Sequence, residues 1–180
     1  MSLTMKITQP VIKTDRFTLR PVSEADTGAL KLHGSDKRVA QNTTTIPHPL
    51  PDGATEAFIA RCNAPDRSED VWVIDPSEDG NQVIGAIALQ RMDRNQSEIG
   101  YWIVPALWNS GIASQAVEAL IEANPQVCRT IFGSVFQDNP ASARVLTNCG
   151  FDYIGEAESF SVARGVTVPT WTYIKALDET

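Results

Sequence analysis

A short turn rich in small polar residues, Trp-Asn-Ser-Gly-Ile-Ala-Ser at 108–114, has residue types that could bind an anion. Asn109 and Ser110 are good helix N-cap residues, and Gly111 removes side-chain bulk just inside the helix that follows. The first N–H groups of a helix have no internal partner, and the helix dipole adds partial positive charge. The turn therefore indicates a site suited to a pyrophosphate. A purely structural turn remains the alternative, because capped helices after strands are common.

A second stretch with chemical potential is Asn-Pro-Ala-Ser-Ala-Arg-Val-Leu-Thr-Asn-Cys-Gly-Phe at 139–151. Asn139 is placed to cap a helix that has proline at its first position, and Ser142 follows three residues later. Ser142 shares an apolar stripe with Val145 and Leu146, and a hydroxyl on such a face needs a hydrogen-bond partner. A backbone carbonyl one turn back or a bound ligand could provide it.

Hydrophobic periodicity predicts the elements that would position these two stretches. We expect helices over about 23–33, 52–62, 110–123 and 139–149, strands over 16–22, 71–74, 83–89, 97–104 and 128–136, and a closing hairpin over 151–160 and 167–177. This mixed order predicts an α+β fold in three α/β/α layers. Its one twisted sheet would be mostly antiparallel, with about seven strands and about four helices.

Composition limits the class of protein and its partners. A chain of 180 residues with 42% hydrophobic content suits one globular domain. Fifteen basic and 22 acidic residues give a net charge of −7, which disfavours nucleic acid. An acidic surface suits a cationic substrate, and a role in solubility alone is the alternative. No apolar stretch could span a bilayer and the N-terminus lacks a secretory signal, so we expect no membrane partner and a cytoplasmic location. The three cysteines fit neither a disulfide framework nor a zinc site, so we expect buried thiols and no metal.

Three segments together, 14–26, 97–121 and 139–151, resemble the GNAT superfamily of N-acetyltransferases. The likeness is closest to the branch of ribosomal-protein N-terminal (alanine/serine) acetyltransferases. It implies one acyl-CoA N-acetyltransferase domain over 1–180, with 1–12 flexible. It also implies acetyl-CoA as donor and a primary amine as acceptor, either a protein N-terminus or a small molecule. A non-catalytic acyl-CoA-binding module of the same fold is the alternative.

The resemblance also implies which residues bind the donor. The family's pyrophosphate loop reads Gln or Arg, two residues, Gly, any residue, then Gly or Ala. Gly111 and Ala113 match this pattern, whereas Trp108 and Asn109 depart from it. The backbone of the turn would hold the diphosphate, and the residues concerned are Asn109, Ser110, Gly111, Ile112, Ala113 and Ser114. The pantetheine arm would follow Ile103 and Val104, at an opening between splayed strands 97–104 and 128–136, with Asn139 and Ser142 on its other side.

For catalysis, the resemblance points to Glu98 as the general base, and a salt-bridged structural glutamate is the alternative. Leu146 occupies the position where many members carry a tyrosine acid, which leaves Ser142 as the candidate acid. Tyr101 and Trp102 are interpreted as core residues, although one of them could line the acceptor site. Loops 43–53 and 159–168 would select the acceptor, and an open edge of the final hairpin would allow a homodimer.

Overall fold

The computed structural model describes residues 9–177 of the chain. Its strands are β1 (Ile12–Lys13), β2 (Thr18–Pro21), β3 (Glu69–Asp75), β4 (Gly85–Met92), β5 (Gln96–Ile103), β6 (Thr130–Phe136), β7 (Asp152–Ser161) and β8 (Val166–Ala176). Its α-helices are α1 (Thr27–Gly34), α2 (Lys37–Ala40), α3 (Ala54–Cys62), α4 (Ile112–Ala123) and α5 (Pro140–Asn148), with 3-10 turns at Glu24–Asp26 and Pro105–Leu107.

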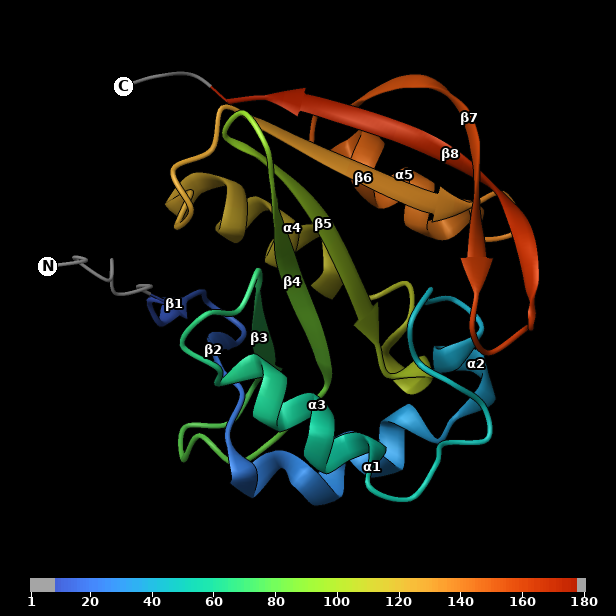
Figure 1. Ribbon diagram of the computed structural model, residues 1–180. Coiled ribbons are helices and arrows are strands. Elements are labelled where there is room, and N and C mark those ends of the chain that lie inside the picture. Colours follow the sequence, from blue (N-terminus) through green and yellow to red (C-terminus); the bar gives the residue numbers. More distant parts are fainter. Residues whose placement is uncertain (1–8, 178–180) are drawn as a thin grey trace, which may run out of the picture.

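All the described strands form one sheet in the order β1-β2-β3-β4-β5-β6-β8-β7 (Figure 1). Every neighbouring pair is antiparallel except β5 and β6, which run parallel. The predicted mixed, mostly antiparallel sheet is therefore confirmed. The structure has one strand and one helix more than we expected, because β1 and α2 have only two and four residues. Elements this short show no hydrophobic period in a sequence.

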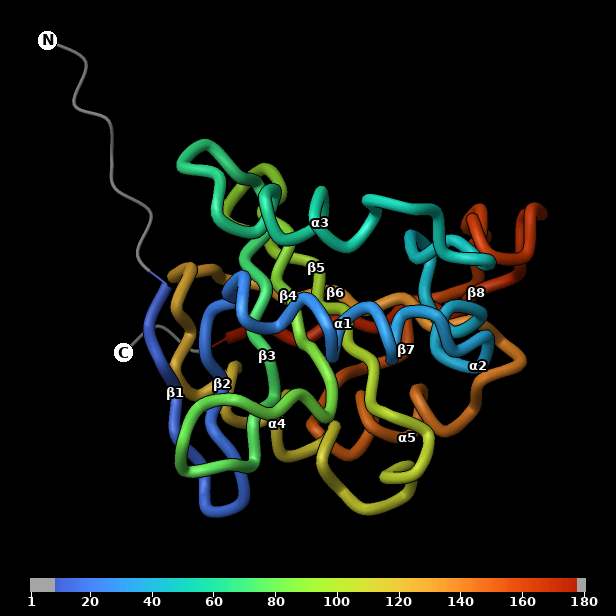
Figure 2. The backbone as a smooth tube through the Cα atoms, turned by 90° about the horizontal axis from the view of Figure 1, so that it is seen from below, coloured from blue at the N-terminus to red at the C-terminus, as the bar shows by residue number. Residues whose placement is uncertain are grey.

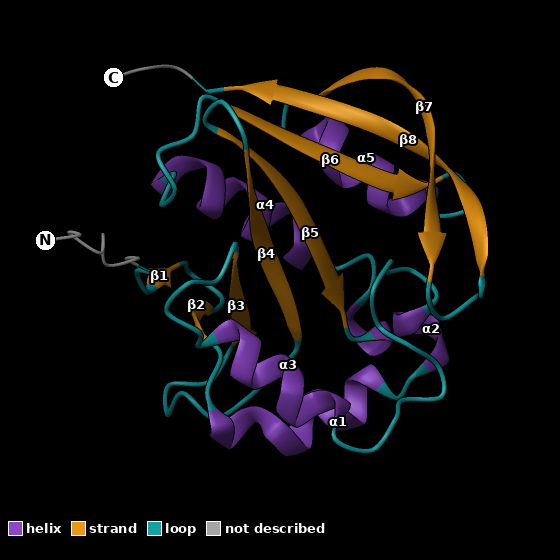
Figure 3. Ribbon diagram, viewed as in Figure 1, coloured by secondary structure: helices purple, strands orange, loops and turns teal. Residues whose placement is uncertain are grey.

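Helices cover both faces of the sheet, so the predicted three layers are present (Figures 2 and 3). On one face, Leu30 of α1 and Ile59 of α3 pack with Val71 and Val73 of β3. On the other face, α4 and α5 pack on a larger core that includes Trp72 and Ile131 among many others. The sheet thus separates two compartments that only a break in strand pairing could join.

That break lies between the two parallel strands. Pairing of β5 with β6 runs from Gln96–Thr130 to Ile99–Gly133 and then stops, while β5 stays paired with β4 as far as Ile103. The predicted opening between 97–104 and 128–136 is therefore confirmed. Gly133 is the last residue of β6 in this pairing. A Cβ at this position would lie 2.7 Å from Leu146 Cδ1. The glycine thus lets α5 pack directly on the β6 backbone.

The two helices beside this opening form as their sequences predict. Residues of α4 at helical spacing are buried, namely Ala116, Val117 and Leu120. Asn139 caps α5 by accepting a hydrogen bond from the Ser142 N–H, and proline occupies the first turn. Each helix thus begins beside the opening and exposes its first turn there.

The N-terminal segment differs in part from its predicted flexibility. Residues 1–8 lie outside the described part of the chain, but residues 9–12 are tied to β3. Gln9 Nε2 donates to the Val71 carbonyl at 2.7 Å, and Trp72 Nε1 donates to the Pro10 carbonyl at 2.8 Å. These long-range bonds involve a buried tryptophan and could not be read from local composition.

Three further expectations concern surfaces and thiols. Between residues 9 and 177, no helix has both the length and the apolar character needed to cross a membrane. The three cysteines are free and buried, as predicted. The open edge of the final hairpin is β7, and a homodimer formed through it stays a prediction.

Candidate active site

Two cavities lie on opposite sides of the strand opening and share part of their lining. The larger, of about 610 Å³, lies on the α1–α3 side, and the smaller, of about 420 Å³, lies beside α4 and α5. Five residues, which we call the junction residues, line both cavities: Asn42, Tyr101, Trp102, Asn139 and Ser142. The opening in the sheet therefore brings the two compartments together at one place.

The smaller cavity gathers the residues predicted to hold the acyl donor. Its lining includes every one of them except Val104: Ile103, Asn109, Ser110, Gly111, Ile112, Ala113, Ser114, Asn139 and Ser142. Arg38 and Arg144 also line it, and sequence reasoning missed both. Their positive charge suits a cavity that would receive phosphates.

The start of α4 differs in detail from the prediction. Gly111 is the N-cap, not Asn109 or Ser110, and no side chain caps the helix. Asn109 has φ 60° and Gly111 φ 81°, both in the left-handed region that glycine and asparagine tolerate best. The Ser110 hydroxyl turns back to donate to the Leu107 carbonyl instead. The turn is therefore tighter than a simple capped helix.

This geometry leaves the backbone donors of the turn free. Within the described residues, the N–H groups of 109–114 donate to no acceptor. Such a run of unpaired N–H groups at a helix start is a concave donor surface for an anion. Gly111 also lies near a cation, because a Cβ added there would be 3.6 Å from Arg16 Nη1. The site can therefore bind negative charge through main-chain groups that no side chain blocks.

Strand β5 presents its free backbone groups to the opening, but not at Val104. The Val104 N–H donates to the Ile84 carbonyl and its own carbonyl accepts from the Leu107 N–H, each at 2.9 Å. Val104 is also absent from the lining of the smaller cavity, and the pantetheine contact at this residue stays a prediction. Since backbone groups alternate along a strand, Tyr101 and Ile103 face the side where β6 has diverged. The Ile103 carbonyl already accepts from Trp108 Nε1 at 2.8 Å.

Ser142 finds a partner other than a helix carbonyl one turn back. Its hydroxyl donates to the Tyr101 oxygen at 3.0 Å, and the Tyr101 hydroxyl donates to the Ser142 backbone carbonyl at 2.9 Å. Burial raises the pKa of the Tyr101 hydroxyl well above its ordinary value. The ring packs against the larger core as expected, but the hydroxyl reaches the junction, which strand alternation alone does not show.

Glu98 lies in the larger cavity and has no ion-pair partner in the described part of the chain. Burial raises its pKa above the ordinary value for glutamate. Glu69 of β3 lines the same cavity. Gln90 of β4 lies between the two glutamates and is the register partner of both. Burial raises the Glu69 pKa most, Arg61 lowers it and Glu98 raises it further. The salt-bridged alternative for Glu98 is thus not what the geometry shows.

Other buried acids form ion pairs with arginine, unlike Glu69 and Glu98. Asp26 and Asp75 each lie 2.8 Å from the guanidinium of Arg20. Asp70 lies between the guanidinium groups of Arg67 and Arg91. The fold therefore neutralises its fully buried carboxylates internally, and leaves unpaired the two that line the larger cavity.

The two loops predicted to select the acceptor touch each other. Residues 43–47 line the larger cavity, and so do Ser159 and Thr170 from the final hairpin. The Val162 N–H donates to the Thr44 carbonyl at 3.1 Å, and Arg164 Nη2 donates to the Gln41 carbonyl at 2.8 Å. One wall of the cavity is thus built by contact between loops more than a hundred residues apart. Across residues 9–177 no His, Cys, Asp or Glu side chains are grouped as metal ligands would be.

Known proteins resemble this chain along most of its length. The model of the acetyltransferase (GNAT) domain family matches residues 16–152. The uncharacterized N-acetyltransferase YoaA of Bacillus subtilis (strain 168) is 27% identical over 173 residues, which cover 91% of this chain and 95% of YoaA.

Two solved structures share the fold. The microcin C7 self-immunity acetyltransferase MccE, in complex with acetyl-CoA and AMP, has a TM-score of 0.79 at 19% identity and covers 95% of this chain and 98% of its own. The ribosomal-protein-S5-alanine acetyltransferase of Vibrio fischeri has a TM-score of 0.76 at 18% identity, with the same coverage of 95% and 98%. At such identities the likeness shows the fold alone, whereas the family match covers more than half of the chain. The chain therefore belongs to the GNAT family of acetyltransferases, enzymes that take acetyl-CoA as the acyl donor.

Proposed function

We propose that this chain transfers the acetyl group of acetyl-CoA to a primary amine that enters the larger cavity as a cation. One observation carries the proposal. A cavity lined by unpaired backbone N–H groups meets, at the junction residues, a cavity lined by unpaired carboxylates. The first suits a diphosphate and the second an ammonium group, so the two substrates would come together where the cavities meet.

On the donor side, the N–H groups of 109–114 would hold the diphosphate, with Arg16, Arg38 and Arg144 supplying positive charge. The N–H groups of Tyr101 and Ile103 on the open side of β5 would bind the pantetheine arm and the developing oxyanion. Asn139 and Ser142 would contact the arm from α5. The thioester carbon would then lie at the junction, within reach of a nucleophile from the larger cavity.

On the acceptor side, the amine must lose a proton before it can attack. A lysine-like amine has a pKa of roughly 10.4 and an α-amine roughly 8, so both are mainly protonated at neutral pH. Glu98 lies three residues before Tyr101 on β5, about 10 Å along the strand, so a water chain would carry the proton to it. Burial raises the pKa of Glu98, which makes its carboxylate a stronger base than an exposed one.

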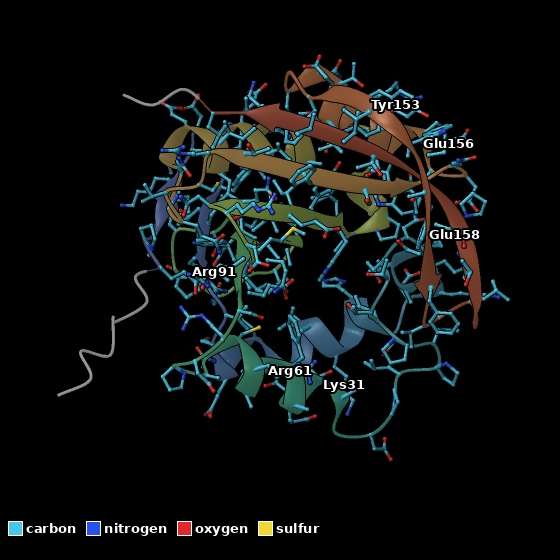
Figure 4. The ribbon with its side chains drawn as sticks, turned by 45° about the horizontal axis from the view of Figure 1, so that its top comes forward. Lys31, Arg61, Arg91, Tyr153, Glu156 and Glu158 are labelled. Carbon is cyan, nitrogen blue, oxygen red and sulfur yellow. The ribbon has the colours of Figure 1, made fainter. Side chains whose placement is uncertain are left out.

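The charges of the larger cavity favour a cationic acceptor. Glu69 and Glu98 face it unpaired. Among the described residues that line it, Arg61 at the end of α3 is the one basic residue (Figure 4). Arg61 packs its guanidinium 6.0 Å from the Phe58 ring centre and makes no ion pair with either glutamate. A small-molecule amine and a protein N-terminus both carry the required charge.

An amine panel with the purified chain tests the proposal. We expect release of free thiol from acetyl-CoA only when a primary amine is present. The acetylated product should be about 42 Da heavier than the amine, because one acetyl group replaces one hydrogen atom. Short peptides with free and blocked N-termini, tested beside alkyl amines and diamines, separate the two acceptor classes. Tight binding of acetyl-CoA without turnover of any amine would contradict the proposal and support the acyl-CoA-binding module.

Glu69→Gln tests the charge argument separately. It should raise KM for a cationic amine several-fold and leave KM for acetyl-CoA unchanged, because Glu69 lines only the larger cavity. Glu158→Gln is the matched control, since that carboxylate lies on the exposed edge strand β7 (Figure 4). Equal effects of the two substitutions would mean that net surface charge, and not the cavity, attracts the acceptor.

A further inference from the structure

Two hydroxyl groups form a closed pair at the meeting point of the cavities. Tyr101 comes from β5 and Ser142 from the first turn of α5, 41 residues apart in sequence. Each hydroxyl donates to the other residue: the Ser142 hydroxyl donates to the Tyr101 oxygen, and the Tyr101 hydroxyl donates to the Ser142 backbone carbonyl. Of the junction residues, these two alone carry hydroxyls.

The pair can rearrange without moving the backbone. A hydroxyl has one hydrogen to donate and two lone pairs that accept, and its hydrogen rotates to suit its partners. Ser142 Oγ accepts from no group in the described part of the chain, so both of its lone pairs are available. The Tyr101 hydrogen can therefore turn from the Ser142 carbonyl to Ser142 Oγ, 3.0 Å away, whenever the serine hydrogen turns toward something else.

We infer that Tyr101 is a positioning residue for acetyl transfer and that it acts through Ser142. The inference rests on the proposed function. As the amine nitrogen bonds to the thioester carbon and the carbon–sulfur bond breaks, the electron pair of that bond goes to sulfur. The Ser142 O–H turns to donate to this sulfur, and the Tyr101 O–H turns to donate to Ser142 Oγ.

No proton is transferred between the hydroxyl groups of Tyr101 and Ser142. The ammonium gives its first proton to Glu98 through water before the attack. The nitrogen loses its second proton to solvent as the amide forms, and the departing thiolate takes a proton from solvent. A hydroxyl that itself accepts a hydrogen bond becomes a stronger donor, so the tyrosine strengthens the bond from serine to sulfur. Burial raises the pKa of Tyr101, which keeps the phenol protonated and hence a donor throughout.

Tyr101→Phe is the direct test, because it keeps the ring and its packing and removes only the hydroxyl. We expect kcat to fall about tenfold, as for the loss of one hydrogen bond made in the transition state, with no change in KM for acetyl-CoA. Ser142→Ala should lower kcat at least as much. The Tyr101→Phe/Ser142→Ala double variant should be no slower than Ser142→Ala alone, because the tyrosine acts only through the serine.

Tyr173→Phe is the matched control. Tyr173 is buried and its ring contacts the Tyr153 ring edge-on, but it lines neither cavity. Removing the Tyr173 hydroxyl should therefore leave kcat unchanged. Thermal unfolding and acetyl-CoA affinity of all variants report whether the fold and donor site remain intact.

Two results would overturn the inference while acetyl transfer itself stands. One is a Tyr101→Phe enzyme whose kcat lies within about twofold of wild type. The other is a double variant whose loss equals the product of the two single losses, because independent effects multiply. A wild-type chain that acetylates no amine would instead defeat the proposed function, and this inference with it.

Discussion

The Arg16 guanidinium donates a hydrogen bond at 3.0 Å to the backbone carbonyl of Ser110, 94 residues further along the chain. This bond ties the segment before β2 to the turn that precedes α4. It engages the Ser110 carbonyl and brings a fixed positive charge to the turn whose N–H groups are free. The proposed anion binding at this turn would therefore involve Arg16, which lies outside the sequence of the turn itself.

Arg16→Ala should weaken donor binding. We expect KM for acetyl-CoA to rise about three- to tenfold, since one charged contact near a phosphate contributes on the order of 1 kcal/mol. Isothermal titration with coenzyme A would measure the effect without turnover, and the difference should shrink at high salt. Lys31→Ala removes the same charge from an exposed position on α1 (Figure 4) and serves as the control. Equal affinities for the two variants would contradict a role for Arg16.

Gly111→Val should disrupt the turn more severely. The residue has φ 81°, which a β-branched side chain adopts only at high cost, and the new Cβ would lie 3.6 Å from Arg16 Nη1. We expect KM for acetyl-CoA to rise more than about tenfold. Gly80→Val imposes a similar strain at φ 72° with no atom within 4 Å of the added Cβ, and Gly80 lines neither cavity. If both variants lose the same affinity, strain alone is responsible.

The pH profile of amine acetylation should depend on Glu98. The wild-type rate should rise as pH passes through the pKa of Glu98, which burial holds above the ordinary value, and then level. Glu98→Gln removes this base, so turnover should fall most at low pH, where free amine is scarce. The remaining rate should follow the pKa of the amine substrate. Unchanged profiles for wild type and variant would exclude Glu98 as the base.

The same glutamates should lower stability at neutral pH. Because burial raises the pKa of Glu69 and Glu98, the folded state binds their protons more tightly than the unfolded state does. Their charged forms therefore cost stability above the folded pKa, and this cost disappears as pH falls below the unfolded pKa. Glu69→Gln and Glu98→Gln should each raise the melting temperature at pH 7 by a few degrees at most, since 1 kcal/mol corresponds to about 2–4 °C at this size. A lower melting temperature at pH 7 would contradict this sign.

Asp70→Asn should destabilise the fold strongly. Asp70 is fully buried between Arg67 and Arg91 and also accepts from Gln126 Nε2 at 3.0 Å. Removing one member of a buried ion pair leaves the other charges uncompensated, which costs about 3–5 kcal/mol. Urea unfolding followed by tryptophan fluorescence would measure this. Asp93→Asn, in the exposed β4–β5 turn, should change the free energy of unfolding by less than about 0.5 kcal/mol.

The sequence by itself determined the local elements and the type of fold. Apolar spacing predicted α4, the Asn139 cap with its proline predicted α5, and continuous apolar runs predicted β3 and β4. These features follow from short-range effects, because helix caps and hydrophobic periods act within a few residues. The free N–H groups of the 109–114 turn could be predicted for the same reason, although the exact cap at Gly111 required backbone dihedrals.

Only the tertiary structure decided which side chains meet. Arg16 reaches Ser110, Tyr101 reaches Ser142, and Glu69 lies in the same cavity as Glu98, yet each pair is separated by at least 29 residues. Such contacts depend on the strand order, on the register across Gln90, and on the point where β5 and β6 part. These are properties of the whole sheet, because register is fixed by the sum of many cross-strand pairs. No single segment encodes them.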